Sequence, residues 1–144
     1  MAKEIEHLYA ELFEAAGVGR RLGESTAQQV GQTQARWQTM WIVGSGALTV
    51  PQISRRLGVT RQGVQRVAAD IVGEGLAAFH PNPDHKTSPL LELTEQGKDV
   101  LERINSTADA SHHRILRRFP HADVSALREL LVRFTDAMKA ADGS

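Results

Sequence analysis

Four long polar side chains lie close together near the start of one amphipathic segment. Arg61, Gln62, Gln65 and Arg66 fall on one side of a helix, because positions three and four residues apart are neighbours there. Arginine can donate two hydrogen bonds to guanine O6 and N7, and glutamine can bond adenine N6 and N7. No acidic residue interrupts this side before Asp70. The set is therefore suited to base edges in the major groove of duplex DNA.

The opposite side of the same segment is apolar. Its residues recur at the spacing of one helical stripe: Val64, Val67, Ala68, Ile71 and Val72. This stripe must pack on the rest of a domain, which leaves the Arg and Gln side exposed. For any single Arg or Gln, a solvated helix surface is the simpler interpretation. The complete arrangement of caps, charges and neighbouring elements favours the DNA-contacting one.

This segment is the second of two short capped helices. Thr49 and Gln52 have the spacing of a capping box, and Gly58 is well placed to end the first helix. Thr60 is a second N-cap after a short turn, and Gly75 stops the second helix. The pattern predicts a helix-turn-helix. The positive N-terminal end of its second helix, at Thr60, also suits a phosphate.

A two-stranded ribbon follows the second helix. Residues 76–80 and 89–93 read as strands joined by an exposed loop at 81–88. Such a ribbon after a helix-turn-helix predicts a wing. Basic side chains from three places could then share one surface; they are Arg55, Arg56, Arg61, Arg66 and Lys86.

Helices are expected on both sides of this core. An apolar stripe runs from Ile5 to Phe13, and Gly17, Gly19 and Gly23 suggest that this helix kinks or ends there, before a polar stretch at 24–32. A second helix carries Trp37 and Trp41. After the ribbon, a long helix capped by Thr94 and a last helix with a stripe from Leu127 to Met138 complete the order αα–αα–ββ–αα. We predict a mostly α protein with a small β wing.

Composition limits the alternatives. The 144 residues include no cysteine, which excludes disulfides and thiolate zinc sites. The 17 basic and 17 acidic residues balance, so a DNA surface must be a local arrangement. We find no phosphate-binding glycine loop, nucleophile elbow or His-Glu-x-x-His motif, and we expect no enzyme, catalytic residue or cofactor. Without a signal peptide or an apolar span, we expect a cytoplasmic protein without membrane contact.

The run TVPQISRRLGVTRQGVQRVAADIVGEGLAAFHPNPDHKTSPLLELTEQG resembles the DNA-binding core of the multiple-antibiotic-resistance regulator (MarR) family. Its most specific parts are the run Asn82-Pro83-Asp84 in the wing, L-x-L-T-x-x-G after it, and the pattern of the recognition helix. The resemblance covers residues 33–98, and it implies dimerisation helices at 1–32 and 99–144. It further implies a homodimeric regulator, which we expect to be a repressor, on a pseudo-palindromic operator. The stripes Ile5–Phe13 and Leu127–Met138 would form the dimer interface, or alternatively an intrachain core.

From these patterns and this resemblance we assign the DNA-contacting residues. They are Thr60, Arg61, Gln62, Gln65, Arg66, Arg55 and Lys86. Lys86 departs from the family, whose members commonly carry Arg two residues after the wing Asp. Lysine keeps the charge but lacks the planar fork that suits a narrow A·T-rich minor groove, so weaker minor-groove discrimination is our hypothesis.

Similarity to the family also implies a small aromatic or phenolic effector, bound between the DNA-binding lobe and the dimer helices. Trp37 and Trp41 are the candidate ligand residues, and their alternative is the protein core. Two other functions stay open. A winged helix can serve protein contacts alone, and some similar regulators sense zinc, for which His112 or His113 with an acidic partner would be needed. Adjacent histidines on a helix point about 100° apart, so they cannot act together on one side.

Overall fold

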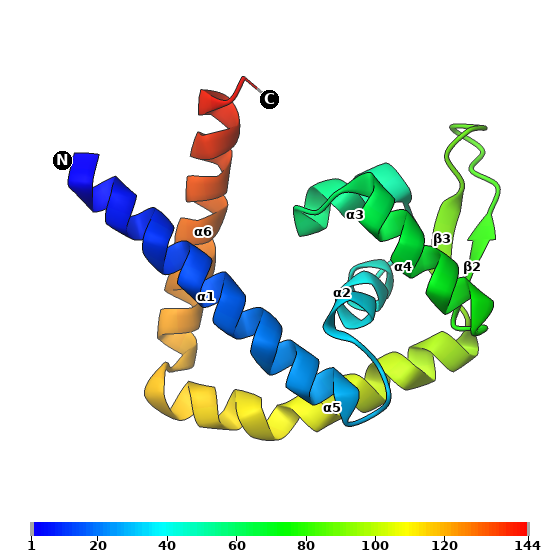
Figure 1. Ribbon diagram of the computed structural model, residues 1–144, viewed down its shortest axis with the longest axis horizontal. Helices are drawn as coiled ribbons and strands as arrows, with labels where there is room; N and C mark the ends of the chain where they lie inside the picture. The colour runs from blue at the N-terminus through cyan, green and yellow to red at the C-terminus, as the bar shows by residue number, and fades with distance from the viewer. Residues whose placement is uncertain (1, 144) are drawn as a thin grey trace. The chain divides into compact units, whose positions relative to one another are not determined.

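The computed structural model describes residues 2–143 and is mostly helical, with one small sheet (Figure 1). The elements are α1 (Ala2–Gln28), α2 (Gln34–Val43), β1 (Leu48–Thr49), α3 (Val50–Leu57), α4 (Arg61–Gly73), β2 (Ala77–His80), β3 (Leu90–Leu93), α5 (Glu95–Arg118) and α6 (His121–Ala141). The predicted fold class, mostly α with a small wing, is confirmed. The chain divides into two compact units between Thr107 and Ala108, inside α5.

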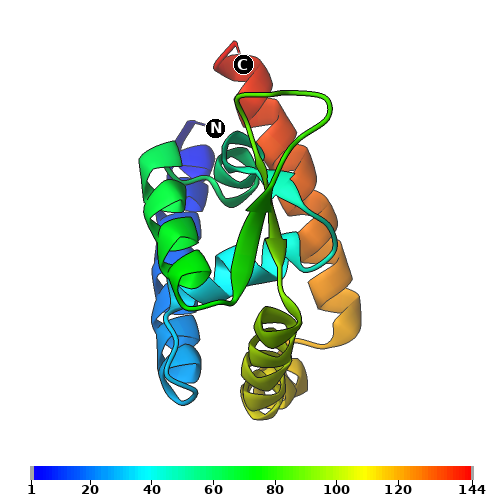
Figure 2. The same cartoon turned by 90° about the vertical axis from the view of Figure 1, so that its right-hand side faces the viewer.

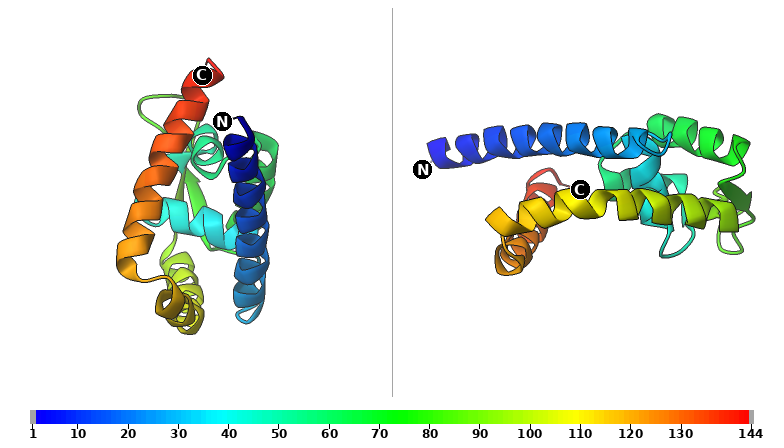
Figure 3. Two further views of the ribbon diagram at one scale, coloured as in Figure 1. Left: turned by 90° about the vertical axis from the view of Figure 1, so that its left-hand side faces the viewer. Right: turned by 90° about the horizontal axis from the view of Figure 1, so that it is seen from below.

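Helix α1 is continuous, as Figure 3 shows, so the predicted break near its glycines is wrong. Glycine weakens a helix by about 1 kcal/mol but does not end it. Gly23 is buried, and a Cβ there would lie 2.9 Å from Cγ of Gln34 on α2. Thr26 and Ala27, in the stretch expected to be a polar linker, are also buried. Packing against α2 therefore extends α1 to Gln28.

The helix-turn-helix has the predicted caps. Oγ1 of Thr49 accepts a hydrogen bond from the backbone N–H of Gln52 at 3.3 Å, and Oε1 of Gln52 accepts from the N–H of Thr49 at 2.9 Å. Gly58 ends α3 with φ of 67°, a left-handed conformation that suits glycine. Oγ1 of Thr60 then accepts from the N–H of Gly63 at 3.0 Å and starts α4. These local bonds fix both ends of the turn.

The sheet has three strands rather than the two predicted. β3 lies in the middle, antiparallel to both neighbours, with Leu91 opposite Leu48 of β1 and Phe79 of β2. β1 is only two residues long, too short to show an alternating pattern in the sequence. Figure 2 shows the paired strands β2 and β3 beneath the long loop that joins them.

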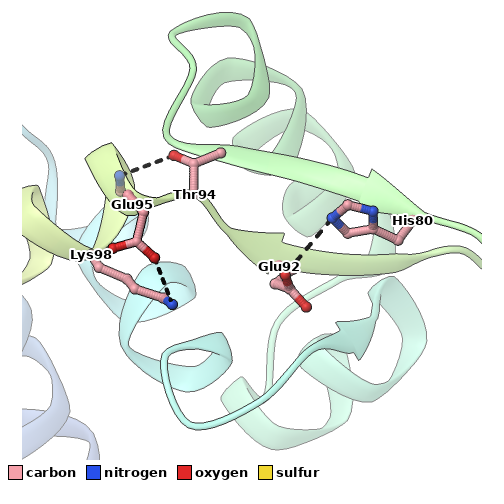
Figure 4. Close-up of polar contacts among 6 residues, drawn as sticks. His80, Glu92, Thr94, Glu95 and Lys98 are labelled. Carbon is pink, nitrogen blue, oxygen red and sulfur yellow. Dashed lines mark hydrogen bonds and ion pairs between the residues drawn. The ribbon is translucent and has the colours of Figure 1, made fainter.

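Thr94 and Gly97 join the end of the wing to the start of α5. The Thr94 hydroxyl donates to the carbonyl of Gly75 at 2.6 Å and accepts from the N–H of Gly97 at 3.1 Å. The Thr94 N–H donates to the carbonyl of Leu76 at 3.1 Å. Figure 4 shows Thr94 at this junction, with His80 facing Glu92 across β2 and β3. The T-x-x-G motif thus fastens α5 to the turn between α4 and β2.

One core fills the first unit. Its largest fully buried side chains come from α2, α3, α4, β3 and α5; they are Met40, Ile53, Val64, Ile71, Leu91 and Ile104. Helix α6 of the second unit has no buried residue, and Leu127, Leu130 and Leu131 are exposed. Ile5, Leu8 and Phe13 of α1 are exposed too. Within its own unit, each of these six side chains lies outside the buried core.

Across residues 2–143, no helix combines the length and the apolar character that crossing a membrane requires.

Candidate nucleic-acid interface

Helix α4 presents the polar side that the sequence predicted. Arg61, Gln62, Gln65 and Arg66 are all exposed, whereas Val64, Ala68 and Ile71 on the other side are buried. Thr60 is exposed at the N-terminus, where its hydroxyl is used by the cap. The first N–H groups of α4 have no partner within the helix, so this end carries a partial positive charge. The helix therefore offers donors to base edges and to phosphate along the same side.

The wing loop is held by the side chain of Asn82. Its Nδ2 donates to the carbonyl of Ser88 at 3.1 Å, and its Oδ1 accepts from the N–H of Asp84 at 3.0 Å. Oγ1 of Thr87 lies 3.2 Å from Nδ1 of His85. This network gives Asn82 of the Asn82-Pro83-Asp84 run its role, because its side chain holds both Asp84 and Ser88. Lys86 lies between these tethered positions and is exposed.

Two hollows adjoin the wing, one beside β1, α3 and Arg61 at the start of α4, the other beside the first turns of α3 and α4. The larger, about 660 Å³, is lined by Arg55 of α3, Arg61 of α4 and the wing residues Asn82, Asp84 and His85, among others. The second, about 520 Å³, adjoins the side chains of Arg61, Gln62 and Gln65 together with Thr87 and Ser88. The structure thus brings four predicted residues, Arg55, Arg61, Gln62 and Gln65, next to the wing. Thr60, Arg66 and Lys86 are exposed but line neither hollow.

Thr87, which lines the second hollow, was not among the residues expected from the sequence to contact DNA, whereas His85, which lines the first, had been considered there against a solvated loop histidine. The sequence places these residues in the wing loop, which can contact DNA. It does not tell them apart from the other exposed residues of that loop. Which loop side chains line the hollows depends on the folded shape of the loop, in which Asn82 bonds both Asp84 and Ser88.

The acidic residues of α4 occupy its far end. Asp70 is exposed one turn before the C-terminus, and Glu74 is the C-cap. The Glu74 carboxylate forms an ion pair with the Arg36 guanidinium of α2. Because Arg36 neutralises Glu74, the negative charge of Glu74 offsets less of the positive charge of Arg61 and Arg66 in the N-terminal half of α4. A chain of zero formal charge can in this way present a locally basic helix.

A separate cavity of about 340 Å³ contains both candidate ligand residues. It is lined by Gly19 and Gly23 of α1, Gln34, Trp37, Gln38 and Trp41 of α2, and Leu57 of α3. Nε1 of Trp37 donates to Oδ1 of Asn105 at 2.9 Å, which fixes the indole ring. Trp37 packs against the core, but Trp41 is 59% exposed, so the core interpretation is wrong for Trp41.

Metal ligands were the remaining candidates. Within residues 2–143 no group of three or more His, Asp or Glu side chains could hold a metal ion. His112 and His113 are both exposed on α5.

Three helices, the last with an exposed polar side, followed by a hairpin beside that side define a winged helix-turn-helix. Residues 31–86 match the MarR family. A protein of Mycobacterium tuberculosis that carries no functional name is 52% identical over 140 residues, covering 97% of this chain and 98% of its own. The transcriptional activatory protein BadR of Rhodopseudomonas palustris is 22% identical, covering 94% of this chain and 80% of its own.

Solved structures have the same fold. A MarR/EmrR family regulator from Acinetobacter superposes with a TM-score of 0.82 at 20% identity, covering 94% of this chain and 96% of that one. MarR from E. coli in complex with operator DNA gives 0.75 at 20% identity, over 91% and 95%. CouR from Rhodococcus jostii, bound to p-coumaroyl-CoA, gives 0.74 at 16% identity, over 83% and 85%. The chain belongs to the MarR family of transcription regulators, which are DNA-binding proteins and not enzymes.

Proposed function

We propose that the protein is a homodimeric repressor that binds a pseudo-palindromic operator through α4 and the wing. The observation that carries this proposal is the exposed side of Arg61, Gln62, Gln65 and Arg66 next to the hollows that the wing lines. Arg55 and the Thr60 end of α4 would contact phosphates, and Lys86 would contact the adjacent groove. A regulator of chromosomal DNA acts in the bacterial cytoplasm, where we place it.

Selection of bound duplexes from random DNA tests this function. We expect a two-fold related sequence with half-sites about one helical turn apart. The logarithm of the affinity should fall linearly with the logarithm of salt concentration, which lowers the affinity by about 10³-fold between 50 and 200 mM if six or more phosphates are neutralised. Titration of the selected duplex at several salt concentrations gives the slope. Recovery of no sequence, or a flat salt response, would instead favour a winged helix that serves protein contacts.

The wing contact depends on Lys86. Lys86→Ala should lower the salt slope by about 1 for each wing, because one phosphate or minor-groove contact is lost. Lys86→Arg should improve binding most where A·T pairs flank the half-sites, because the guanidinium sheds water more readily than an ammonium group does. Both are measured on the selected duplex and on a flank-substituted version. Equal affinity of Lys86→Ala and the unmodified protein would exclude the wing contact.

The dimer interface would use the exposed apolar stripes of α1 and α6. Leu130 is 56% exposed, which is costly in a helix that faces only water and is explained if a second copy covers it. Leu130→Lys should convert the dimer to a monomer, detected by sedimentation, and abolish high-affinity operator binding. Ser125→Lys is the matched control, since it adds the same charge to an exposed polar position of α6. Monomer formation in the control as well would argue against this stripe.

An effector site is the second part of the proposal. The cavity around Trp37 and Trp41 is lined by aromatic, aliphatic and glutamine residues without a charged side chain, a lining that fits a planar aromatic ligand with a neutral hydroxyl. Leu57 of this cavity ends α3, so an occupant touches the helix-turn-helix. Repeating the duplex titration with phenol and p-coumarate as probes, with tryptophan fluorescence as the binding signal, tests release. Unchanged fluorescence with both probes would contradict phenolic binding here.

Repression is our assignment because a dimer bound across two half-sites excludes other proteins from the same DNA. BadR, a transcriptional activatory protein, is a distant relative of this chain. Transcription in vitro from a template carrying the selected site distinguishes the two modes. Less transcript with added protein supports repression, and more transcript overturns it.

A further inference from the structure

The least exposed ion pair among the described residues joins α2 to the end of α4. Nη2 of Arg36 pairs with Oε2 of Glu74, and Nη1 of Arg36 donates to Oε1 of Gln32 at 3.3 Å. The Arg36 side chain is only 19% exposed, whereas the other two pairs have both side chains more than half exposed. Exposed pairs contribute little, but a guanidinium that binds two acceptors in its planar fork holds them in a set geometry.

Each partner of Arg36 is itself attached to a different helix. The Gln32 N–H donates to the carbonyl of Ala27 at 2.9 Å, so this residue is fastened to the last turn of α1. Glu74 is the C-cap of α4, with its N–H bonded to the carbonyl of Asp70 at 3.1 Å. Arg36 thus connects the end of α1, the first turn of α2 and the end of α4.

Glu74 has an electrostatic reason to need this partner. A carboxylate at a helix C-terminus faces the negative end of the helix dipole, which is unfavourable unless a cation compensates it. Directly after it, the turn to β2 passes through Gly75, whose carbonyl accepts from the Thr94 hydroxyl. The C-terminal end of α4 is therefore held on one side by Arg36 and on the other by the wing junction.

The direction of α4 matters because base contacts occur at its other end. A helix of 13 residues is about 20 Å long, so a tilt of roughly 5° about its C-terminus would move Arg61 by about 2 Å. A binding constellation must be held to about 0.5 Å to be productive. A small change of helix direction at Glu74 therefore moves Arg61 by more than base contacts tolerate.

We propose that Arg36 is a positioning residue for sequence recognition: by joining Gln32 and Glu74 it sets the direction of α4, without touching DNA itself. This inference rests on the proposed DNA binding. It predicts that removing the pair weakens discrimination between DNA sequences more than it weakens attraction to DNA in general. Phosphate contacts tolerate a small tilt, because they depend on charge, but bidentate base contacts do not.

The test compares two affinities: that for the selected duplex and that for an unrelated duplex of the same length, both at low salt. Arg36→Met keeps the side-chain stem and removes the charge, and Glu74→Gln removes the other partner. We expect each to lower the ratio of the two affinities about 10-fold, and the double variant to be no worse than either single one, as for coupled residues. Arg36→Lys, which cannot hold both acceptors, should fall between.

Lys98→Met is the matched control, because it removes an exposed ion pair, with Glu95, that does not involve α4. Its ratio should stay within about twofold of the unmodified protein. A ratio unchanged in both Arg36→Met and Glu74→Gln overturns the inference while leaving the proposed function intact. If the unmodified protein itself shows no preference for any duplex, the proposed function fails, and this inference fails with it. Should Arg36→Met not fold, Glu74→Gln alone decides.

Discussion

Arg61→Ala should weaken binding to the selected operator by about 1–3 kcal/mol at each half-site, hence by roughly 2–6 kcal/mol for a homodimer. Arg61 starts α4 and lines both hollows beside the wing, so it stands where a recognition helix meets base edges. Its donors would pair with guanine in a geometry that no other base offers. The loss should therefore be large on the selected sequence and smaller on unrelated DNA.

The salt dependence separates base reading from phosphate binding. If Arg61 reads a base, Arg61→Ala relaxes the preference at one position of the half-site and changes the salt slope little. If it binds phosphate, affinity falls evenly for all sequences and the slope falls by about 1 for each half-site. Arg66→Ala, one turn further on the same exposed side, is measured in the same way. Selection repeated with each variant locates the position that it reads.

Arg103→Ala is the control for charge alone. Arg103 is exposed on α5, near Val30 and Glu102, outside the proposed interface. Its loss changes the net charge of the protein by the same amount as Arg61→Ala, but at a site away from α4 and the wing. A loss of operator affinity in Arg103→Ala as large as that in Arg61→Ala would mean that α4 has no special role.

The parts of this fold that the sequence predicted are those whose causes are local. The capping box of Thr49 and Gln52 and the left-handed Gly58 depend on residues a few positions apart, and both were predicted correctly. The two sides of α4 followed from its apolar period. Because the same period determines which side faces out, most of the candidate interface could be placed without the structure.

The parts that could not be predicted depend on contacts between distant residues. Arg36 and Glu74 meet although 38 positions separate them, and neither has a local pattern that points to the other. The short strand β1 exists only because β3 lies beside it. Likewise, the sequence near Gly23 does not indicate that Gln34 packs against it and that α1 therefore continues to Gln28.

Trp41 shows a third kind of limit. Its spacing from Trp37 correctly placed both rings on one side of α2, and both line one cavity. Aromatic residues at helical spacing are usually core, yet only Trp37 packs against the core here. Helical spacing tells which residues share a side, but what covers that side depends on the other elements of the fold.

Gly97→Ala should be the most destabilising single substitution proposed for this protein, at about 3 kcal/mol or more. A Cβ at Gly97 would lie 1.8 Å from the carbonyl oxygen of Leu76 and 2.9 Å from its carbon. Both are backbone atoms, so no side-chain rotation relieves the clash. The same oxygen accepts the N–H of Thr94, and moving it would open the junction between the wing and α5. Thermal unfolding should shift down by roughly 10 °C.

Gly73→Ala supplies a control of opposite sign. Gly73 lies in α4 with ordinary helical backbone and with nothing within 4 Å of the position of a new Cβ. Alanine there should stabilise by about 0.5–1 kcal/mol, because it restricts the unfolded chain without meeting an obstacle. The same glycine-to-alanine substitution should thus raise stability at Gly73 and lower it at Gly97, depending on which atoms the new Cβ meets. A Gly97→Ala protein as stable as Gly73→Ala would show that α5 can leave the Leu76 carbonyl at little cost, and that the T-x-x-G motif has no role in fastening the wing.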